Sequence, residues 1–118
     1  MNTMRKLISV IELPEFRNFA KHSLSDEETT SIIDCLASNP EVGIVIQGTG
    51  GVRKVRFALH NKGKSGGVRI IYFYHNENIP IFLITGFAKS KMENISKATC
   101  NELKKMTDLI IQNYKRKK

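Results

Sequence analysis

The chain has 118 residues, of which 41% are hydrophobic; this length and composition predict one compact domain over residues 1–118 and argue against a disordered chain. No apolar run approaches the roughly 20 residues needed to span a bilayer, and the N-terminus lacks the apolar segment of a signal peptide, so we expect a cytoplasmic protein without a membrane partner. The net charge of +8 is unevenly spread along the chain. Residues 1–48 hold four Lys/Arg and seven Asp/Glu, whereas residues 49–118 hold fifteen Lys/Arg and four Asp/Glu. The basic charge of the second part favours a polyanionic partner, most often nucleic acid.

The first third of the chain predicts one strand followed by two helices. Residues 8–13 are rich in β-branched side chains, which favours a strand. Pro14 suits the first turn of a helix, and apolar residues follow it at helical spacing. Ser25 and Glu28 have the spacing of a capping box, so a second helix begins here, and the Asn-Pro at residues 39–40 ends it.

The rest of the chain predicts three strands and a final helix. Residues 47–51 form a glycine-rich loop, which lacks the Lys-Ser/Thr ending and the following helix of a phosphate-binding P-loop. Strands are expected at residues 52–57, 68–74 and 79–85, and short connections between them favour an antiparallel meander. A helix over about residues 97–114 completes an α+β fold.

Several motifs in the second half resemble those of one toxin superfamily. The order of strand, two helices, three strands and helix is similar to that of the RelE/ParE superfamily. The stretches that carry a closer resemblance to HigB-type toxins are Ile46–Arg56, Gly63–Tyr72, Leu83–Thr85, Phe87–Lys91 and Asn94–Ser96. Together they run from Ile46 to Ser96, and the remaining residues match in order and length.

The resemblance implies an activity, partners and a RelE-like fold. Toxins of this kind belong to type II toxin–antitoxin systems and cleave messenger RNA in the decoding site of a translating ribosome. The partners implied are messenger RNA, ribosomal RNA and a cognate antitoxin, often one with a helix-turn-helix DNA-binding domain. No cofactor or metal is implied.

The basic residues of the central strands suit such a reaction. Attack by the 2′-hydroxyl of RNA needs a proton acceptor, stabilisation of the negative phosphorane and a proton donor for the leaving 5′-oxygen. Oriented cations stabilise the phosphorane without a metal, and a Lys beside other cations can transfer protons. From Arg53 to Arg69 there are six Lys/Arg and no acid.

Arg69 is the strongest candidate for gripping the scissile phosphate, because its guanidinium fork binds two phosphate oxygens and it stands where the family carries an Arg. Lys54 and Arg56 lie two residues apart and so share a strand face, and they match a basic pair of RelE; we favour Lys54 as the base. The catalytic candidates are Arg69, Lys54, Arg56 and Lys89. The candidates for RNA or ribosome contact are Arg53, Lys62, Lys64, Phe87 and Lys91.

One departure from the family affects proton transfer. Many relatives have Tyr where this chain has Phe87, and a Phe can stack on a base but cannot move a proton. The proton-transfer role would then fall to a Lys or to His60, because histidine is a common acid–base residue near neutral pH. Three other functions stay open: a ParE-like inhibitor of DNA gyrase, a non-catalytic RNA- or ribosome-binding module, and a degenerate toxin.

Overall fold

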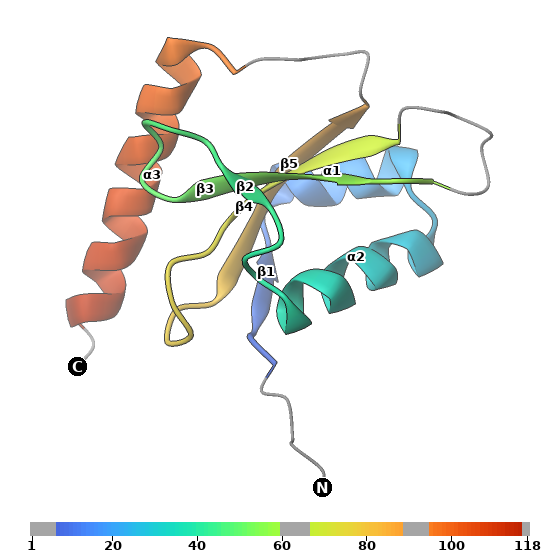
Figure 1. The fold of residues 1–118 in the computed structure, drawn as a ribbon, viewed down its shortest axis with the longest axis horizontal. Coiled ribbons are helices and arrows are strands. Elements are labelled where there is room, and N and C mark those ends of the chain that lie inside the picture. The colour runs from blue at the N-terminus through green and yellow to red at the C-terminus, as the bar shows by residue number, and fades with distance from the viewer. Residues whose placement is uncertain (1–6, 60–66, 89–94, 117–118) are drawn as a thin grey trace, which may run out of the picture.

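The structure is a computed structural model that describes residues 7–59, 67–88 and 95–116. Its elements form an α+β fold, as the sequence predicts (Figure 1). In chain order they are β1 (Val10–Glu12), α1 (Pro14–Ser23), α2 (Asp26–Ser38), β2 (Ile44–Val45), β3 (Val52–Phe57), β4 (Val68–Phe73), β5 (Ile81–Ala88) and α3 (Lys97–Arg116). No helix in these described ranges is both long and apolar enough to cross a membrane.

The strands form one mixed sheet in the order β1-β5-β4-β3-β2. The predicted antiparallel meander is confirmed as β3-β4-β5. β1 pairs with β5 in parallel, which makes β5 an interior strand. The short edge strand β2 was not predicted; its two residues pair with Lys54 and Arg53 of β3. β5 also begins and ends later than the predicted range of 79–85.

Helices α1 and α2 cover one face of the sheet. Apolar residues recur along each helix at one-turn spacing, and Phe16 of α1 and Leu36 of α2 are fully buried against Ile70 and Leu83 of the sheet. Burial of a side chain of this size contributes about 1.5–3 kcal/mol. The two helices therefore cover this face of the sheet and leave the opposite face to other contacts.

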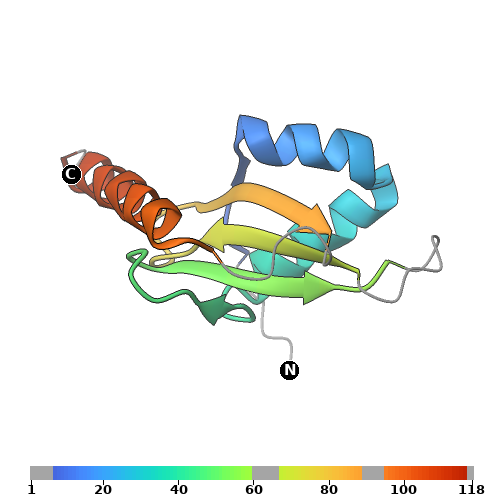
Figure 2. The same ribbon diagram turned by 90° about the horizontal axis from the view of Figure 1, so that it is seen from above.

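Helix α3 packs on the opposite face, apart from the α1–α2 pair (Figures 1 and 2). Its apolar side chains contact a second core cluster that includes Val52 and Phe73, at one end of the central strands. Thr107 of α3 is fully buried, and its hydroxyl donates to the carbonyl of Thr49 at 3.0 Å. α3 is therefore tied to the loop that precedes β3 and packs at that end of the face.

Residues 40–43, which lead into β2, are fixed to the sheet by two cross-strand neighbours. The hydroxyl of Tyr72 accepts from the backbone N–H of Gly43 and donates to the carbonyl of Pro40, both at 2.8 Å. Arg53, which pairs with Tyr72 across the sheet, donates to the carbonyl of Gly43 at 2.7 Å. One buried tyrosine and one guanidinium thus satisfy the backbone of this segment.

We expect Tyr72→Phe to lower the free energy of unfolding by about 1–3 kcal/mol, because the buried N–H of Gly43 and the partly buried carbonyl of Pro40 both lose their partner. Denaturant unfolding measures this change. Tyr74→Phe, two residues along the chain, is the matched control and should change stability by less than about 0.5 kcal/mol. Equal stability of Tyr72→Phe and the parent would contradict this role.

Tyr72 also makes the free energy of unfolding depend on pH in the alkaline range. Burial raises the pKa of Tyr72 above its usual value. The unfolded chain therefore releases this proton first, and the free energy of unfolding falls as the pH rises above about 10. Denaturant unfolding of the parent and of Tyr72→Phe at pH 8 and pH 11 tests this. The free energy of unfolding should fall less between these two pH values in Tyr72→Phe than in the parent.

Candidate functional site

The register of the central strands brings three basic residues to the face that α3 partly covers. Lys54 and Arg56 of β3 alternate with Val55 and Phe57, which pack against the core on the α1–α2 side, and so lie on this face. Arg69 of β4 is directly opposite Arg56. We call Lys54, Arg56 and Arg69 the basic cluster. Phe87 of β5 pairs with Arg69 on its other side, so Arg56, Arg69 and Phe87 form one row across three strands.

The arrangement of the basic cluster suits an anion. Side chains at directly opposite positions of an antiparallel pair stand about 4.5–5.5 Å apart at Cβ, and like charges placed there repel each other. A phosphate bound between Arg56 and Arg69 lowers this repulsion and accepts charge-assisted hydrogen bonds. Arg56 is exposed, whereas Arg69 and Lys54 are partly buried. The cluster is thus reachable from solvent and backed by the sheet.

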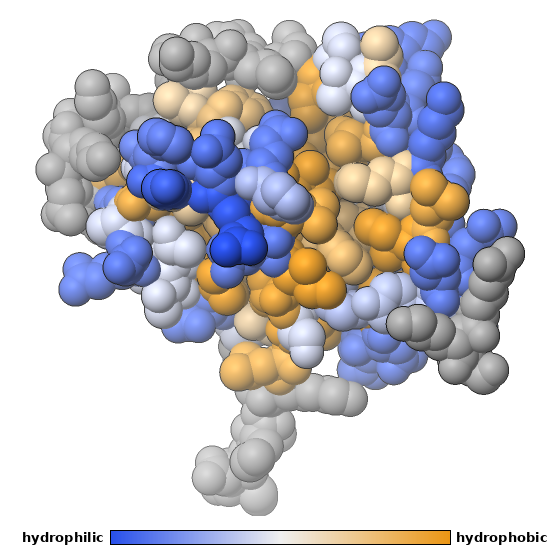
Figure 3. All heavy atoms as spheres, turned by 180° about the vertical axis from the view of Figure 1, so that it is seen from behind, coloured by the Kyte–Doolittle hydropathy of each residue, from blue (hydrophilic) through white to orange (hydrophobic). Residues whose placement is uncertain are grey.

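A hollow of about 500 Å³ lies beside this row, between β5 and α3. It includes Phe87 and has an apolar floor that contains Ile71 and Ile84. Figure 3 shows apolar surface between the hydrophilic residues of α1 and those of α3, where this hollow opens. Phe87, one strand spacing from Arg69, thus links the basic cluster to this hollow.

The structure separates Arg53 from the basic cluster. Alternation along β3 puts it on the opposite face, as the sequence predicts. Its guanidinium donates to the carbonyls of Gly43 and Glu41, at 2.7 and 3.2 Å. Arg53 therefore supports the segment before β2 and does not join the basic cluster, so the RNA contact predicted for it stays a prediction from the sequence.

Four of the predicted site residues lie outside the described residues. They are Lys62, Lys64, Lys89 and Lys91, and the alternative candidate His60 also falls there. Their roles stay predictions from the sequence.

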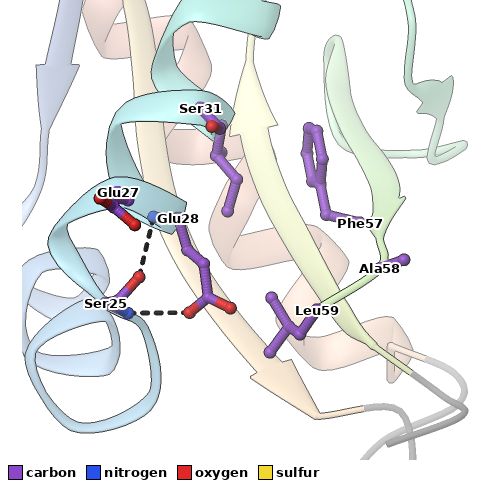
Figure 4. A pocket seen from close by; sticks show the side chains of 8 residues that line it. Ser25, Glu27, Glu28, Ser31, Phe57, Ala58 and Leu59 are labelled. Atoms are coloured by element: carbon purple, nitrogen blue, oxygen red, sulfur yellow. Dashed lines mark hydrogen bonds between the residues drawn. The ribbon is translucent and has the colours of Figure 1, made fainter. Parts of the chain in front are cut away.

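A second hollow, of about 530 Å³, lies between the first turns of α2 and the end of β3 (Figure 4). Its polar groups belong to the predicted capping box: Ser25 N–H donates to Glu28 Oε1 at 2.8 Å, and Glu28 N–H donates to Ser25 Oγ at 3.0 Å. Phe57 and Leu59 form its other wall. The ionisable groups among its described lining residues are carboxylates, which repel a phosphate, and the hollow lies on the face that α2 covers, away from the basic cluster.

Sequence reasoning did not single out the polar residues of the hollow beside Phe87. They are Glu15, Thr85, Thr99 and Glu102. The register shift between β4 and β5 at Ile71/Tyr72 inserts an extra residue, so that Ile84 and Thr85 both reach this hollow. No local pattern in the sequence marks this bulge, and the approach of α3 depends on a contact between residues 58 positions apart.

The chain matches a known protein family over almost its whole length. A family model described as the RelE toxin of the RelE / RelB toxin-antitoxin system matches residues 10–118. The match begins at the first residue of β1 and includes every helix and strand described above.

Proposed function

The chain belongs to the RelE toxin family, and from this premise we propose that it cleaves messenger RNA in the decoding site of the ribosome. Its role as the toxin of a toxin–antitoxin system follows from the family. Among the family's types we propose the HigB type, on the motifs between Ile46 and Ser96. The activity is that of an endoribonuclease that acts in the cytoplasm, where ribosomes are, and inhibits translation.

One observation carries the proposal: Arg56 and Arg69 are directly opposite each other on the sheet face that α3 partly covers, and Lys54 lies on the same face two residues before Arg56. A gyrase inhibitor or a simple docking module needs no such convergence at one point. Two guanidinium forks can hold the non-bridging oxygens of one phosphate and stabilise the charge that develops there.

The reaction needs no group beyond the chain and its RNA. Lys54, in its neutral form, accepts the proton of the 2′-hydroxyl while the 2′-oxygen forms a bond to phosphorus. The bond from phosphorus to the 5′-oxygen then breaks, and the products are a 2′,3′-cyclic phosphate and a 5′-hydroxyl. Arg69 and Arg56 stabilise the phosphorane, and Lys89 protonates the leaving oxygen in our assignment. Phe87 stacks on a neighbouring base.

The partners in this proposal are messenger RNA, ribosomal RNA and an antitoxin. Lys62, Lys64 and Lys91 contact RNA phosphates, which attract Lys side chains without regard to sequence. In this proposal the antitoxin carries a helix-turn-helix DNA-binding domain, which antitoxins of this family often have.

Lys54→Arg separates proton transfer from charge. An Arg keeps the cation but does not give up its proton, so we expect cleavage to fall by about 10²-fold or more if Lys54 is the base. Binding to ribosomes, measured by co-sedimentation, should stay within about twofold of the parent because the net charge is unchanged. Cleavage by Lys54→Arg at the parental rate would assign Lys54 to RNA docking alone.

The experiment that tests the function is inducible expression of the parental chain in bacteria, with sequencing of messenger RNA 5′ ends. New 5′ ends in frame with codons, inside translated regions, are the expected result. Growth arrest with intact messages and altered DNA supercoiling would indicate gyrase inhibition instead. Growth without arrest would indicate a degenerate toxin.

A further inference from the structure

The hollow beside Phe87 lies at the end of the row formed by Arg56, Arg69 and Phe87. Phe87 pairs directly with Arg69 and also lines the hollow. Ile71, the next residue of β4 on this face, pairs with Thr85, and both line the hollow as well. When Arg69 holds a phosphate of the RNA, an adjacent nucleotide can therefore reach the hollow.

The chemistry of the hollow differs from that of the basic cluster. Its walls are mostly apolar, and its polar groups are two carboxylates and two hydroxyls, those of Glu15, Glu102, Thr85 and Thr99. Among the lining residues that the structure describes, none is a Lys or an Arg. Carboxylates repel a phosphate but accept hydrogen bonds from amino groups on the edge of a base. The hollow thus suits a flat, uncharged ring with N–H donors.

Several contacts position Thr85, Thr99 and the α3 backbone beside the hollow. The bulge in β5 turns Thr85 toward it. Ser96 Oγ donates to Thr99 Oγ1 at 3.0 Å and accepts from the backbone N–H of Thr99 at 3.1 Å, which fixes the first turn of α3. The Thr107 hydroxyl, bonded to the carbonyl of Thr49, holds the middle of α3 against the loop before β3.

Glu102 is better placed than Glu15 to select a ligand. Glu15 lies in the first turn of α1, where a negative charge also stabilises the helix. Glu102 lies on α3 one turn from Thr99 and from Met106, and all three residues line the hollow. Its carboxylate therefore stands on the rim of an apolar floor.

We propose that this hollow binds the base of one nucleotide that flanks the scissile phosphate, and that Glu102 selects bases with an exocyclic amino group over uracil. Adenine, cytosine and guanine each carry an amino group that a carboxylate accepts, whereas uracil has a carbonyl oxygen at the corresponding position of cytosine. The inference rests on the proposed function, because it assumes that RNA lies along the row from Arg56 to Phe87.

The test compares Glu102→Gln with Asp108→Asn, a control on the same helix that makes the same change of net charge. Cut sites are sequenced from a message library with random codons on ribosomes. We expect the parent and the control to disfavour uracil about tenfold at one flanking position, and Glu102→Gln to reduce this to about threefold or less. An even base composition in the parent, or an unchanged preference in Glu102→Gln, would overturn the proposal.

A second measurement separates this inference from the proposed function. Cytidine 5′-monophosphate and uridine 5′-monophosphate are titrated into the full-length protein, and the backbone amide signals of Leu103 and Met106 are followed by NMR. Stronger shifts with the cytidine nucleotide in the parent, lost in Glu102→Gln, would support the hollow even if ribosomes show no cleavage. Equal shifts for both nucleotides would contradict it. An effect of Glu102→Gln on antitoxin binding alone would assign the hollow to the antitoxin.

Discussion

We expect Arg69→Ala to lower the rate of message cleavage by about 10²- to 10³-fold, the usual effect of removing one group that stabilises developing charge. Arg69 lies at the centre of the row, because it pairs with Arg56 on one side and with Phe87 on the other. The rate is measured in a single turnover with purified protein and ribosomes programmed with a defined message.

Two further variants define what Arg69 contributes. Arg69→Lys keeps the charge but loses the fork that binds two oxygens, so its rate should lie between those of the parent and the alanine variant. Arg17→Ala removes an equal charge from the exposed surface of α1 and should cleave within about twofold of the parent. Parental cleavage by Arg69→Ala, with its melting temperature unchanged, would remove Arg69 from the site.

Gly67→Ala should lower the free energy of unfolding by about 3 kcal/mol, the sum of a left-handed backbone penalty and of overpacking. Gly67 has a φ of +65° and directly precedes β4. A methyl group there would clash with the carbonyl oxygen of Phe57 on β3, and a backbone atom cannot move aside without breaking the strand pair. The loss is measured by denaturant unfolding.

Gly48→Ala is the control for the clash. Gly48 has a φ of +83°, but a Cβ at this position meets no atom within 4 Å. It should therefore show the backbone penalty alone, about 1–2 kcal/mol. Because Gly67 sets the start of the strand that carries Arg69, Gly67→Ala should also cleave more slowly than Gly48→Ala at a temperature where both are folded. Equal stability of the two variants would contradict the clash.

Local patterns in the sequence were sufficient for most of the fold. The capping box of Ser25 and Glu28 depends on groups three residues apart, and the structure confirms both of its hydrogen bonds. The strand β2 was missed because its two residues pair with β3 but are exposed, so no alternation of buried side chains marks them. The parallel pairing of β1 with β5 joins segments about 70 residues apart and has no local signal.

The basic cluster was only partly predictable, because part of it depends on the pairing of strands. Alternation puts Lys54 and Arg56 on one face of β3, but only the register shows that Arg69 is opposite Arg56. Arg53 has the same charge, yet its guanidinium is occupied by carbonyls of residues 41 and 43 on the other face. Glu102 was passed over because its position depends on where α3 docks, which a single buried hydroxyl, that of Thr107, helps to determine.

The most direct test of the account uses a message with one 2′-deoxynucleotide at the mapped cut site, on ribosomes with that codon in the decoding site. If the neighbouring 2′-hydroxyl is the nucleophile, the parental protein cuts the all-ribose message to a 2′,3′-cyclic phosphate and leaves the deoxy-substituted message intact. Cleavage of both messages at similar rates would show that water attacks instead, and would contradict the roles proposed for Lys54, Arg56 and Arg69.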